Sequence, residues 1–261
     1  MSAQSQAFRT LFERVSGLCD LPPLPAVAAR AMALIRDPET EAEDLARLVA
    51  TDATIAARVL RLSRSVLYVR RQPPRTLREA IVTVGYGALR KMLLVASARS
   101  AYPQQDAVAR GLWEHSLATA LACDELAVAA GEPRGGASFI AGLMHDIGRL
   151  VFHVSDPAGY ASLPAWDEEG ELARFGVTHA AVGACLAEQW GIETEVVDAL
   201  MFHHAEAATG MAARVQTGDR IAHEIGYGST NAVLPRLEDE DVAAVAERVL
   251  VTFVEQRGLF E

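Results

Sequence analysis

Seven histidines occur in the 261-residue chain, and all of them lie between residues 115 and 223. Five of these histidines and two aspartates fall on the apolar faces of segments with helical periodicity. These seven residues are His115, His145, Asp146, His179, His203, His204 and Asp219. A buried polar group without a partner costs about 1–3 kcal/mol, so these side chains need a shared partner or one another. The remaining two histidines, His153 and His223, are interpreted as bystanders.

Imidazole nitrogens and carboxylate oxygens together suit divalent Fe, Mn and Zn, and Mg also accepts carboxylates. Side chains from separate helices can converge on such an ion in the core of a helical bundle. We therefore expect His145 and Asp146, in the stretch AGLMHDIGRLVFH, to lie at the centre of a divalent-metal site. His115 and Asp219 are expected to share the ion with them. The alternative is a metal-free network of hydrogen bonds among the same residues.

Every long segment has the apolar spacing of a helix, and no segment alternates convincingly over the length of a strand. The predicted fold class is therefore all-α. From residue 107 onward we expect helices at about 107–130, 137–152, 178–190, 193–206, 211–225 and 239–257. In the first half, Thr40 with Glu43 and Thr76 with Glu79 fit the capping box. Gly85 is expected to end the helix that Thr76 begins.

A break in the helical pattern at residues 101–109 divides the chain into two expected parts. Residues 1–104 form an N-terminal helical lobe, and residues 105–261 form a second helical lobe with a C-terminal helix. Within the second lobe, the stretch 155–170 is rich in Gly, Pro and acidic residues. We expect it to form a surface flap near the mouth of the histidine site.

The overall composition restricts the partners of the protein. The net charge of −10 disfavours nucleic acid. The longest apolar stretch, MLLVASA, is far shorter than the roughly 20 residues of a membrane span, so no membrane partner is expected. The three cysteines, Cys19, Cys123 and Cys185, are widely spaced and form no CxxC pair. They are interpreted as reduced thiols of a cytoplasmic protein.

The charge is distributed unevenly, since residues 58–99 contain ten basic residues and one acidic residue. The residues expected to form a basic surface are Arg58, Arg61, Arg64, Arg70, Arg71 and Arg75. The first three lie along one side of an expected helix, and the other three follow in the next loop. Such a surface would attract an acidic partner protein or an anionic ligand such as a nucleotide. The alternative is an ordinary solvated face.

The order of the ligand candidates resembles that of the HD phosphohydrolase superfamily, in LWEHSL, GLMHDIG, FGVTHAAVG, ALMFHHAEA and TGDRIAH. The first lobe resembles a more specific family. LPPLPAVAARAMALIRDPETEAEDLARLVATDATIAARVLRLSRSVLY, followed by LREAIVTVGYGALRKMLL, is similar to the HDOD family, the HD-related output domain of bacterial signalling proteins. The resemblance implies an HD-like helical bundle with an N-terminal helical lobe and a regulatory role in signal transduction.

Two departures limit the activity that this resemblance implies. The related HD-GYP phosphodiesterases have a Gly-Tyr-Pro motif shortly after the paired histidines, where this chain has HHAEAATGMAA. They usually have lysine where Arg149 stands. We therefore expect a regulatory protein that contacts signalling proteins in trans, with or without a divalent metal. The alternative is a metal-dependent phosphohydrolase acting on a nucleotide or phosphodiester. In that case His179, His203 and His204 would complete a second ion or hold phosphate.

Overall fold

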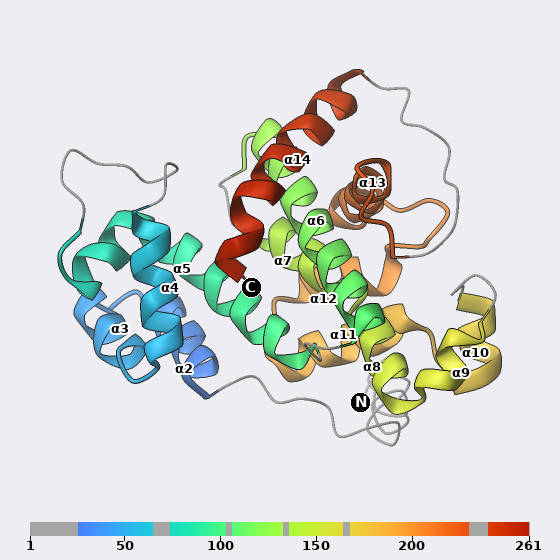
Figure 1. Cartoon of the computed structure of the whole chain (residues 1–261), viewed down its shortest axis with the longest axis horizontal. Helices are drawn as coiled ribbons and strands as arrows, with labels where there is room; N and C mark the ends of the chain where they lie inside the picture. The colour runs from blue at the N-terminus through green and yellow to red at the C-terminus, as the bar shows by residue number, and fades with distance from the viewer. Residues whose placement is uncertain are drawn as a thin grey trace.

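The protein, studied as a computed structural model, is described over residues 26–64, 74–102, 106–132, 136–163, 168–229 and 240–260. Regular structure within these ranges is helical, and they contain no strand (Figure 1). The all-α fold class is therefore confirmed. None of the described helices is long and apolar enough to cross a membrane.

The helices fall into two groups along the chain. The first group contains α2 (Ala26–Arg36), α3 (Ala42–Val49), α4 (Ala53–Ser63) and α5 (Leu77–Ala101). The second group contains α6 (Ala107–Ala129), α7 (Ala137–Met144), α8 (Ile147–Ser155), α9 (Pro157–Ala161), α10 (Glu168–Phe175), α11 (His179–Gln189), α12 (Thr194–Phe202), α13 (Gly210–Glu224) and α14 (Glu240–Phe260).

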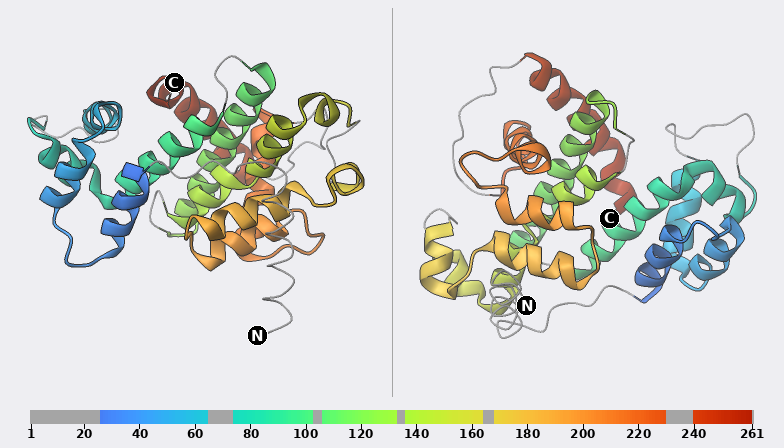
Figure 2. Two further views of the ribbon diagram at one scale, coloured as in Figure 1. Left: turned by 90° about the horizontal axis from the view of Figure 1, so that it is seen from below. Right: turned by 180° about the vertical axis from the view of Figure 1, so that it is seen from behind.

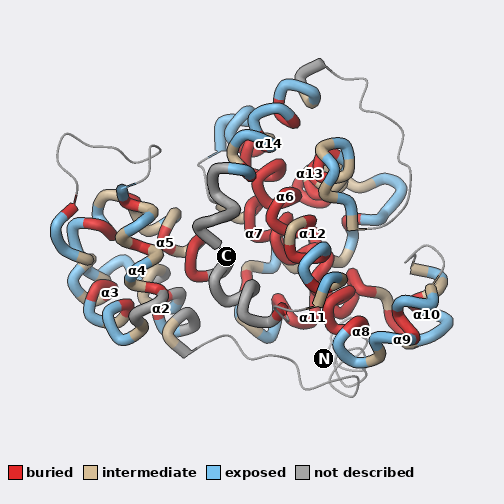
Figure 3. Tube along the Cα trace, viewed as in Figure 1, coloured by how far each residue is buried: buried red, intermediate tan, exposed pale blue. Residues whose placement is uncertain are grey.

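Buried apolar side chains of the described residues form two separate clusters. The smaller cluster joins α2, α3, α4 and α5 as far as Leu93. The larger cluster begins at Tyr102 and includes side chains of α6, α7, α8 and α11 to α14. Figure 2 shows α5 leading from the small group of helices to the large one. Figure 3 shows that buried residues are concentrated along α6, α7, α8 and α11. We propose that the lobes divide near residue 104, between α5 and α6.

Gly85 bends α5 rather than ending it, which corrects the predicted end of this helix. Its φ of 80° and ψ of 164° are non-helical, and glycine adopts a positive φ without the steric cost that a Cβ brings. The chain re-enters a helix directly afterwards, and Leu89 and Leu93 beyond the bend are fully buried in the smaller cluster. Burial of these two leucines stabilises the part of α5 that follows Gly85.

The two predicted capping boxes have different outcomes. The hydroxyl of Thr76 accepts from the backbone N–H of Glu79 at 3.1 Å, as expected at the start of α5. The Thr40–Glu43 pairing is wrong, because α3 has Glu41 as its N-cap. The backbone N–H of Glu41 donates to Asp44 at 3.2 Å. Glu41 and Asp44 therefore cap α3 in place of the predicted pair Thr40 and Glu43.

Two helices of the second lobe end earlier than their apolar spacing predicts, and both end at ligand candidates. The expected helix 137–152 is two helices, because α7 ends at Met144 and α8 begins at Ile147. Asp146, with φ −101° and ψ 11°, is the N-cap of α8. Similarly, α12 ends at Phe202, so His203 and His204 follow it instead of lying on its face. The ligand candidates His145, Asp146, His203 and His204 therefore lie at helix ends.

The expected surface flap at 155–170 is largely helical where the structure describes it. Residues 157–161 form α9 and residues from 168 onward form α10. Tyr160 of α9 and Glu171 of α10 are fully buried, so these helices contribute side chains to the interior. Residues 164–167 lie outside the described ranges. The loop part of the prediction is wrong, because burial of the Tyr160 ring stabilises α9 against the lobe, whereas a position near the mouth of the histidine site stays a prediction.

An ion pair joins the two lobes. Arg90 of α5 forms hydrogen bonds with both carboxylate oxygens of Glu193, the N-cap residue of α12. The side chain of Arg90 is 19% exposed and that of Glu193 is 41% exposed, so water reaches the pair only in part. Both hydrogen bonds come from one guanidinium nitrogen, Nη2, so the pair fixes the distance between the two side chains without forming a two-nitrogen fork. The start of α12 is therefore tied to the first lobe.

Candidate metal centre

The seven ligand candidates come together in the second lobe as two neighbouring groups. The first group is His115, His145 and Asp219, and the second group is Asp146, His179, His203 and His204. In each group, one ligand atom from each residue lies within 4.8 Å of the ligand atoms of all the others. The structure thus brings together residues that lie up to about a hundred positions apart in the chain.

The first group lies where α6, α7 and α13 meet. The Nε2 atom of His115 in α6 is 3.1 Å from Nε2 of His145, which follows α7. It is 3.2 Å from Oδ1 of Asp219 in α13. Both histidines are at most 1% exposed, and the Asp219 side chain is 21% exposed. One edge of this group is therefore open.

Close helix packing at two glycines makes this approach possible. A Cβ atom at Gly142 of α7 would lie 2.9 Å from Ala120 and from the sulfur of Cys123, both in α6. A Cβ atom at Gly218 of α13 would lie 2.7 Å from the same sulfur. Such distances are too short for carbon contacts, so larger residues at Gly142 or Gly218 would push apart the helices that carry His115, His145 and Asp219.

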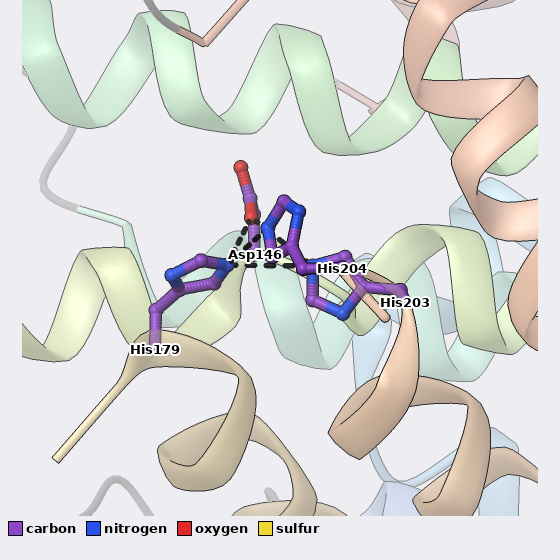
Figure 4. A group of neighbouring side chains, drawn as sticks. All are labelled: Asp146, His179, His203 and His204. Atoms are coloured by element: carbon purple, nitrogen blue, oxygen red, sulfur yellow. Dashed lines mark hydrogen bonds and ion pairs between the residues drawn. The ribbon is translucent and has the colours of Figure 1, made fainter. Parts of the chain in front are cut away.

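The second group centres on His179, the first residue of α11 (Figure 4). Its Nε2 atom is 3.2 Å from Oδ1 of Asp146, 3.3 Å from Nε2 of His203 and 3.0 Å from Nε2 of His204. The hydroxyl of Thr178 caps α11 by accepting from the N–H of Ala181. His204 is exposed at the edge of the group, whereas the other members are buried.

Asp146 lies between the two groups. Its carboxylate is 3% exposed. Oδ2 is 3.5 Å from Nε2 of His115 in the first group. Oδ1 is 3.2 Å from Nε2 of His179 and 3.9 Å from Nε2 of His203 in the second group. Oδ1 also lies 3.6 Å from Nε2 of His145 in the first group, so one carboxylate contacts members of both groups.

Hydrogen bonds fix the orientation of four imidazole rings. Nδ1 of His115 pairs with the carbonyl of Tyr227 at 2.8 Å, and Nδ1 of His145 with that of Gly142 at 2.9 Å. Nδ1 of His203 pairs with the carbonyl of Leu200 at 2.7 Å. Nδ1 of His179 pairs with Oε2 of Glu171, also at 2.7 Å. Since each partner is an oxygen acceptor, Nδ1 must carry the proton. In the neutral rings, Nε2 is then an unprotonated nitrogen that faces the shared centre.

Electrostatics favours the ligand forms of these residues. Burial lowers the pKa of His145 and holds the pKa values of His179 and His203 well below their usual range. Burial alone would raise the pKa of Asp146, but the guanidinium of Arg149 and the nearby histidines hold that pKa well below its usual range. At neutral pH, the rings of His145, His179 and His203 are therefore neutral, and the carboxylate of Asp146 is ionised.

His115 and Asp219 form a coupled pair at the edge of the first group. Burial opposes protonation of His115, but its hydrogen bond with Asp219 and the charges of Asp219 and Asp146 raise its pKa. The same contact lowers the pKa of Asp219 despite the opposing effect of burial. A proton held between these residues therefore competes with any cation that binds there.

A layer of three buried residues supports the second group from behind. Arg149 Nε lies 2.9 Å from Oδ1 of Asp146, and Nη1 lies 3.5 Å from Oε1 of Glu171. The hydroxyl of Tyr160 lies 3.4 Å from Arg149 and 3.5 Å from Glu171. Burial raises the pKa of Glu171 to about 8, although Arg149 opposes this effect. The hydroxyl, guanidinium and carboxyl groups therefore connect one ligand candidate, Asp146, with another, His179.

The two other histidines differ in position. His153 pairs with Asp106 at 2.7 Å, and neither residue belongs to the two groups. His223 lies closer to the first group than the sequence indicates. Its ring centroid is 5.5 Å from that of His115, and its Nε2 is 3.6 Å from Asp219. His223 belongs to neither group of potential ligands, but it borders the first.

The expected basic surface is described only in part. Arg58, Arg61 and Arg64 follow one another along the end of α4, with Arg61 and Arg64 exposed and Arg58 half-buried. Arg75 is exposed just before α5. Arg70 and Arg71 lie outside the described residues. The role of the six arginines as a surface for an anion or a partner stays a proposal.

Comparison with known proteins identifies the family. The family model of the HDOD domain matches residues 21–206, which include the first lobe and six of the seven ligand candidates. The chain belongs to the HDOD family. As an HDOD protein it shares its fold with an HDOD domain protein of unknown function from Geobacter sulfurreducens. The TM-score is 0.67 at 21% identity, over 97% of this chain and 95% of the other. A proposed phosphohydrolase from Shewanella amazonensis SB2B has a TM-score of 0.70 at 22% identity, over 96% and 95% of the two chains.

Two relatives are similar in sequence to this HDOD chain. An uncharacterised protein of Treponema pallidum (strain Nichols) is 25% identical over 77% of this chain and 41% of its own length. Ribonuclease Y of Geotalea uraniireducens (strain Rf4) is 31% identical over 43% of this chain and 18% of its own length. The HDOD chain thus spans less than half of the length of the curated relatives that it matches.

The hydrogen-bond acceptors that orient the histidine rings were not predicted from the sequence. The carbonyls of Gly142 and Leu200 lie three residues before His145 and His203, at helix ends where backbone carbonyls have no intrahelical partner. That spacing is a usable signal once the helix ends are known. Glu171 gave no signal, because the stretch DEEGELARF has the composition of an exposed helix.

Proposed function

We propose that this HDOD protein is a regulatory component of bacterial signal transduction, that it acts in the cytoplasm through contacts with partner proteins in trans, and that its second lobe binds divalent metal. Family membership supports the regulatory role, since the HDOD domain is an output domain of signalling proteins. The geometry of the two groups supports the metal.

One observation carries the metal proposal. Nε2 of His179 faces Nε2 of His203 and of His204 at 3.3 and 3.0 Å, and the proton of His179 is on Nδ1. His203 likewise carries its proton on Nδ1, so no hydrogen bond can join Nε2 of His179 to Nε2 of His203. Two lone pairs at this distance need a cation between them. Metal–ligand bonds of about 2.0–2.2 Å place neighbouring ligand atoms roughly 3.0–3.4 Å apart, which fits the separations around His179.

The central carboxylate provides a second test of this fit. Oδ1 of Asp146 is buried and has no hydrogen-bond donor of suitable geometry among the described residues. Oδ1 of Asp219, in the first group, has Nε2 of His115 as its close neighbour at 3.2 Å. The buried charge of Asp146 has the guanidinium of Arg149 beside it at 2.9 Å, and a metal ion would supply the bond to Oδ1 that this guanidinium does not complete as a hydrogen bond. The imidazole and carboxylate donors suit Fe, Mn or Zn, and Mg is the remaining candidate.

Elemental analysis tests the metal proposal. Protein without a histidine tag is purified, dialysed and analysed by inductively coupled plasma mass spectrometry, before and after reconstitution with Mn²⁺ or Fe²⁺. We expect one to two equivalents of metal per chain. Less than a tenth of an equivalent after both reconstitutions would overturn the proposal in favour of a metal-free network.

The proposed partner surface is the basic one on α4. Arg58, Arg61 and Arg64 present positive charge on a protein whose net charge is −10, which favours an acidic partner protein or an anionic ligand there. Affinity capture from a bacterial lysate with the wild type and with the double variant Arg58→Glu, Arg61→Glu tests this surface. We expect the variant to lose the captured signalling protein. Equal capture by both proteins would place the partner elsewhere.

A phosphohydrolase acting on a nucleotide or phosphodiester is the second candidate, and the position of Asp146 favours it. Its carboxylate lies between the two groups and within 3.6 Å of His115, His145 and His179, a position from which it could be shared by two ions. A bound divalent pair would supply Lewis-acid activation of water and charge neutralisation on a phosphate group. His204, exposed at the edge, could donate to a phosphate oxygen when protonated.

An activity panel separates the two functions. Mn²⁺- and Fe²⁺-loaded protein is incubated with cyclic dinucleotides, nucleoside triphosphates and bis-p-nitrophenyl phosphate. We expect no turnover above that of the Asp146→Ala variant if the protein is regulatory. Metal-dependent turnover that this variant abolishes would establish the second candidate. The HDOD fold alone does not distinguish the regulatory function from the phosphohydrolase function, because proteins described in either way share this fold.

A further inference from the structure

Glu171 is a fully buried carboxyl group on α10, a helix that carries none of the seven ligand candidates. Its Oε2 atom accepts two hydrogen bonds from His179, one from the backbone N–H and one from Nδ1, both at 2.7 Å. The main chain and the ring of His179 are therefore held by one oxygen atom. A buried acid in this position needs an explanation, since carboxyl groups are rarely buried without a specific partner.

The contact differs from those of the other fixed histidines in the centre. His115, His145 and His203 donate Nδ1–H to backbone carbonyls, which are neutral. His179 donates to a carboxyl group, whose negative form strengthens the hydrogen bond and makes the opposite nitrogen more basic. Nε2 of His179 is also the atom with the largest number of close ligand neighbours in the second group.

From this geometry we infer that Glu171 is a positioning residue for metal in the second group, acting through His179. It fixes the Nδ1–H tautomer, aims Nε2 at the centre and raises its donor strength. The inference rests on the proposed metal binding. Helix α10 is then a functional part of the centre, although its sequence has the composition of an exposed acidic helix.

The other oxygen of Glu171 links this function to Asp146. Oε1 is 3.5 Å from Arg149, and Arg149 is 2.9 Å from the carboxylate of Asp146. His179 and Asp146 are themselves 3.2 Å apart. Four residues thus form a closed ring of contacts with the two ligand candidates on the side of the proposed ion. Loss of the Glu171 carboxyl removes one of the two acidic partners of Arg149, which increases the pull of the guanidinium on Asp146 and withdraws charge from that carboxylate as a ligand.

The test compares Glu171→Gln with Glu169→Gln, an exposed neighbour on the same helix, as the matched control. Mn²⁺ binding to metal-free protein is measured by isothermal titration calorimetry and by electron paramagnetic resonance of the free ion. Mutation of such an outer partner typically weakens metal binding by 10- to 100-fold. We expect this loss at one of two Mn²⁺ sites for Glu171→Gln and no change for Glu169→Gln. Circular dichroism of both variants checks that the fold is kept.

A double-mutant cycle distinguishes positioning from a general structural role. If Glu171 acts through His179, Glu171→Gln adds no further loss of Mn²⁺ affinity in a His179→Ala background. An equal loss in both backgrounds would overturn the inference, as would an affinity of Glu171→Gln within twofold of the wild type. If Glu171→Gln unfolds, Glu171→Asp carries the same test, with an intermediate loss expected. A wild-type protein without metal would instead overturn the proposed function itself.

Discussion

At the scale of single residues, the centre depends on how one buried carboxylate is neutralised. Asp146 has Arg149 on one side and histidine nitrogens on the others, and its pKa is held well below the usual range by these neighbours against the effect of burial. The guanidinium is permanent, whereas a metal ion is exchangeable. Substitution of either Asp146 or Arg149 therefore separates the contribution of the ion from that of the protein.

Asp146→Ala is expected to abolish metal content and the stability that metal confers. A ligand at 100 times its Kd stabilises the folded state by about 2.7 kcal/mol. For a chain of this size this corresponds to a rise in Tm of roughly 5–11 °C. Differential scanning calorimetry with Mn²⁺ and with a chelator should show this rise in the wild type and none in the variant. A variant destabilised equally in both conditions would indicate the metal-free network.

Arg149→Met is expected to destabilise the metal-free protein more than the metal-loaded one. Without the guanidinium and without an ion, Asp146 is a buried uncompensated charge, and breaking such a pair costs about 3–5 kcal/mol. A bound ion replaces part of the lost positive charge. Urea denaturation with chelator and with saturating Mn²⁺ measures the difference. The control is Arg174→Met, which breaks an exposed pair with Asp156 and should cost less than about 1 kcal/mol in both conditions.

At the scale of elements, the histidine and aspartate pattern predicted the members of the centre better than their local structure. His115 and Asp219 lie within α6 and α13 as expected, because their helices continue past them. His145, Asp146 and His203 lie at helix ends, which apolar spacing cannot locate when the residues on both sides are apolar. Chain breaks in a buried segment depend on tertiary hydrogen bonds, such as those from the rings to Gly142 and Leu200.

The start of α6 gives a pH-dependent prediction. Asp106 accepts hydrogen bonds from the N–H groups of Val108 and Ala109 and pairs with His153. The backbone hydrogen bond from Ala109 and the contact with His153 lower its pKa. A lowered folded-state pKa means that the stabilisation is present above the unfolded value of about 3.9 and is lost as the pH falls through the folded value.

Asp106→Ala should therefore lower the free energy of unfolding by about 1 kcal/mol at pH 7, the usual cost of losing an N-cap. The difference from the wild type should shrink below about pH 4, where the wild-type carboxylate also becomes protonated. Urea denaturation across this pH range measures it. A difference independent of pH would show that the charge of Asp106 contributes nothing. Asp106→Asn, which keeps the capping oxygen, serves as the control.

At the scale of the whole molecule, the ion pair between Arg90 and Glu193 is one of the contacts that connect the two lobes. Arg90→Ala is expected to increase hydrogen exchange at the end of α5 and the start of α12, with a loss of about 0.5–1 kcal/mol in stability. Arg78→Ala is the matched control, since Arg78 is 3.7 Å from Glu43 with both side chains more than half exposed. Hydrogen exchange that is unchanged by Arg90→Ala would show that the lobes stay joined by other contacts.

The all-α fold and the family were predictable at this scale, because they depend on helical spacing and on motifs spread over the whole chain. The pair Arg90–Glu193 was not, since its members are 103 positions apart and each has the composition of an ordinary surface charge. Contacts of this kind depend on how the lobes are placed, which local patterns do not encode. The two buried clusters likewise emerge only from packing.

The short length of α12 gives the lobe contact a mechanical consequence. The helix has nine residues, so it is a rod of about 13.5 Å, with Glu193 before its first residue and His203 and His204 after its last. A helix this short does not bend appreciably, so its two ends move together. If the first lobe rotates while Arg90 keeps its hold on Glu193, the displacement reaches the paired histidines at the far end. If the histidines are fixed by an ion, the rod resists that rotation. We therefore expect α12 to couple occupancy of the centre to the angle between the lobes.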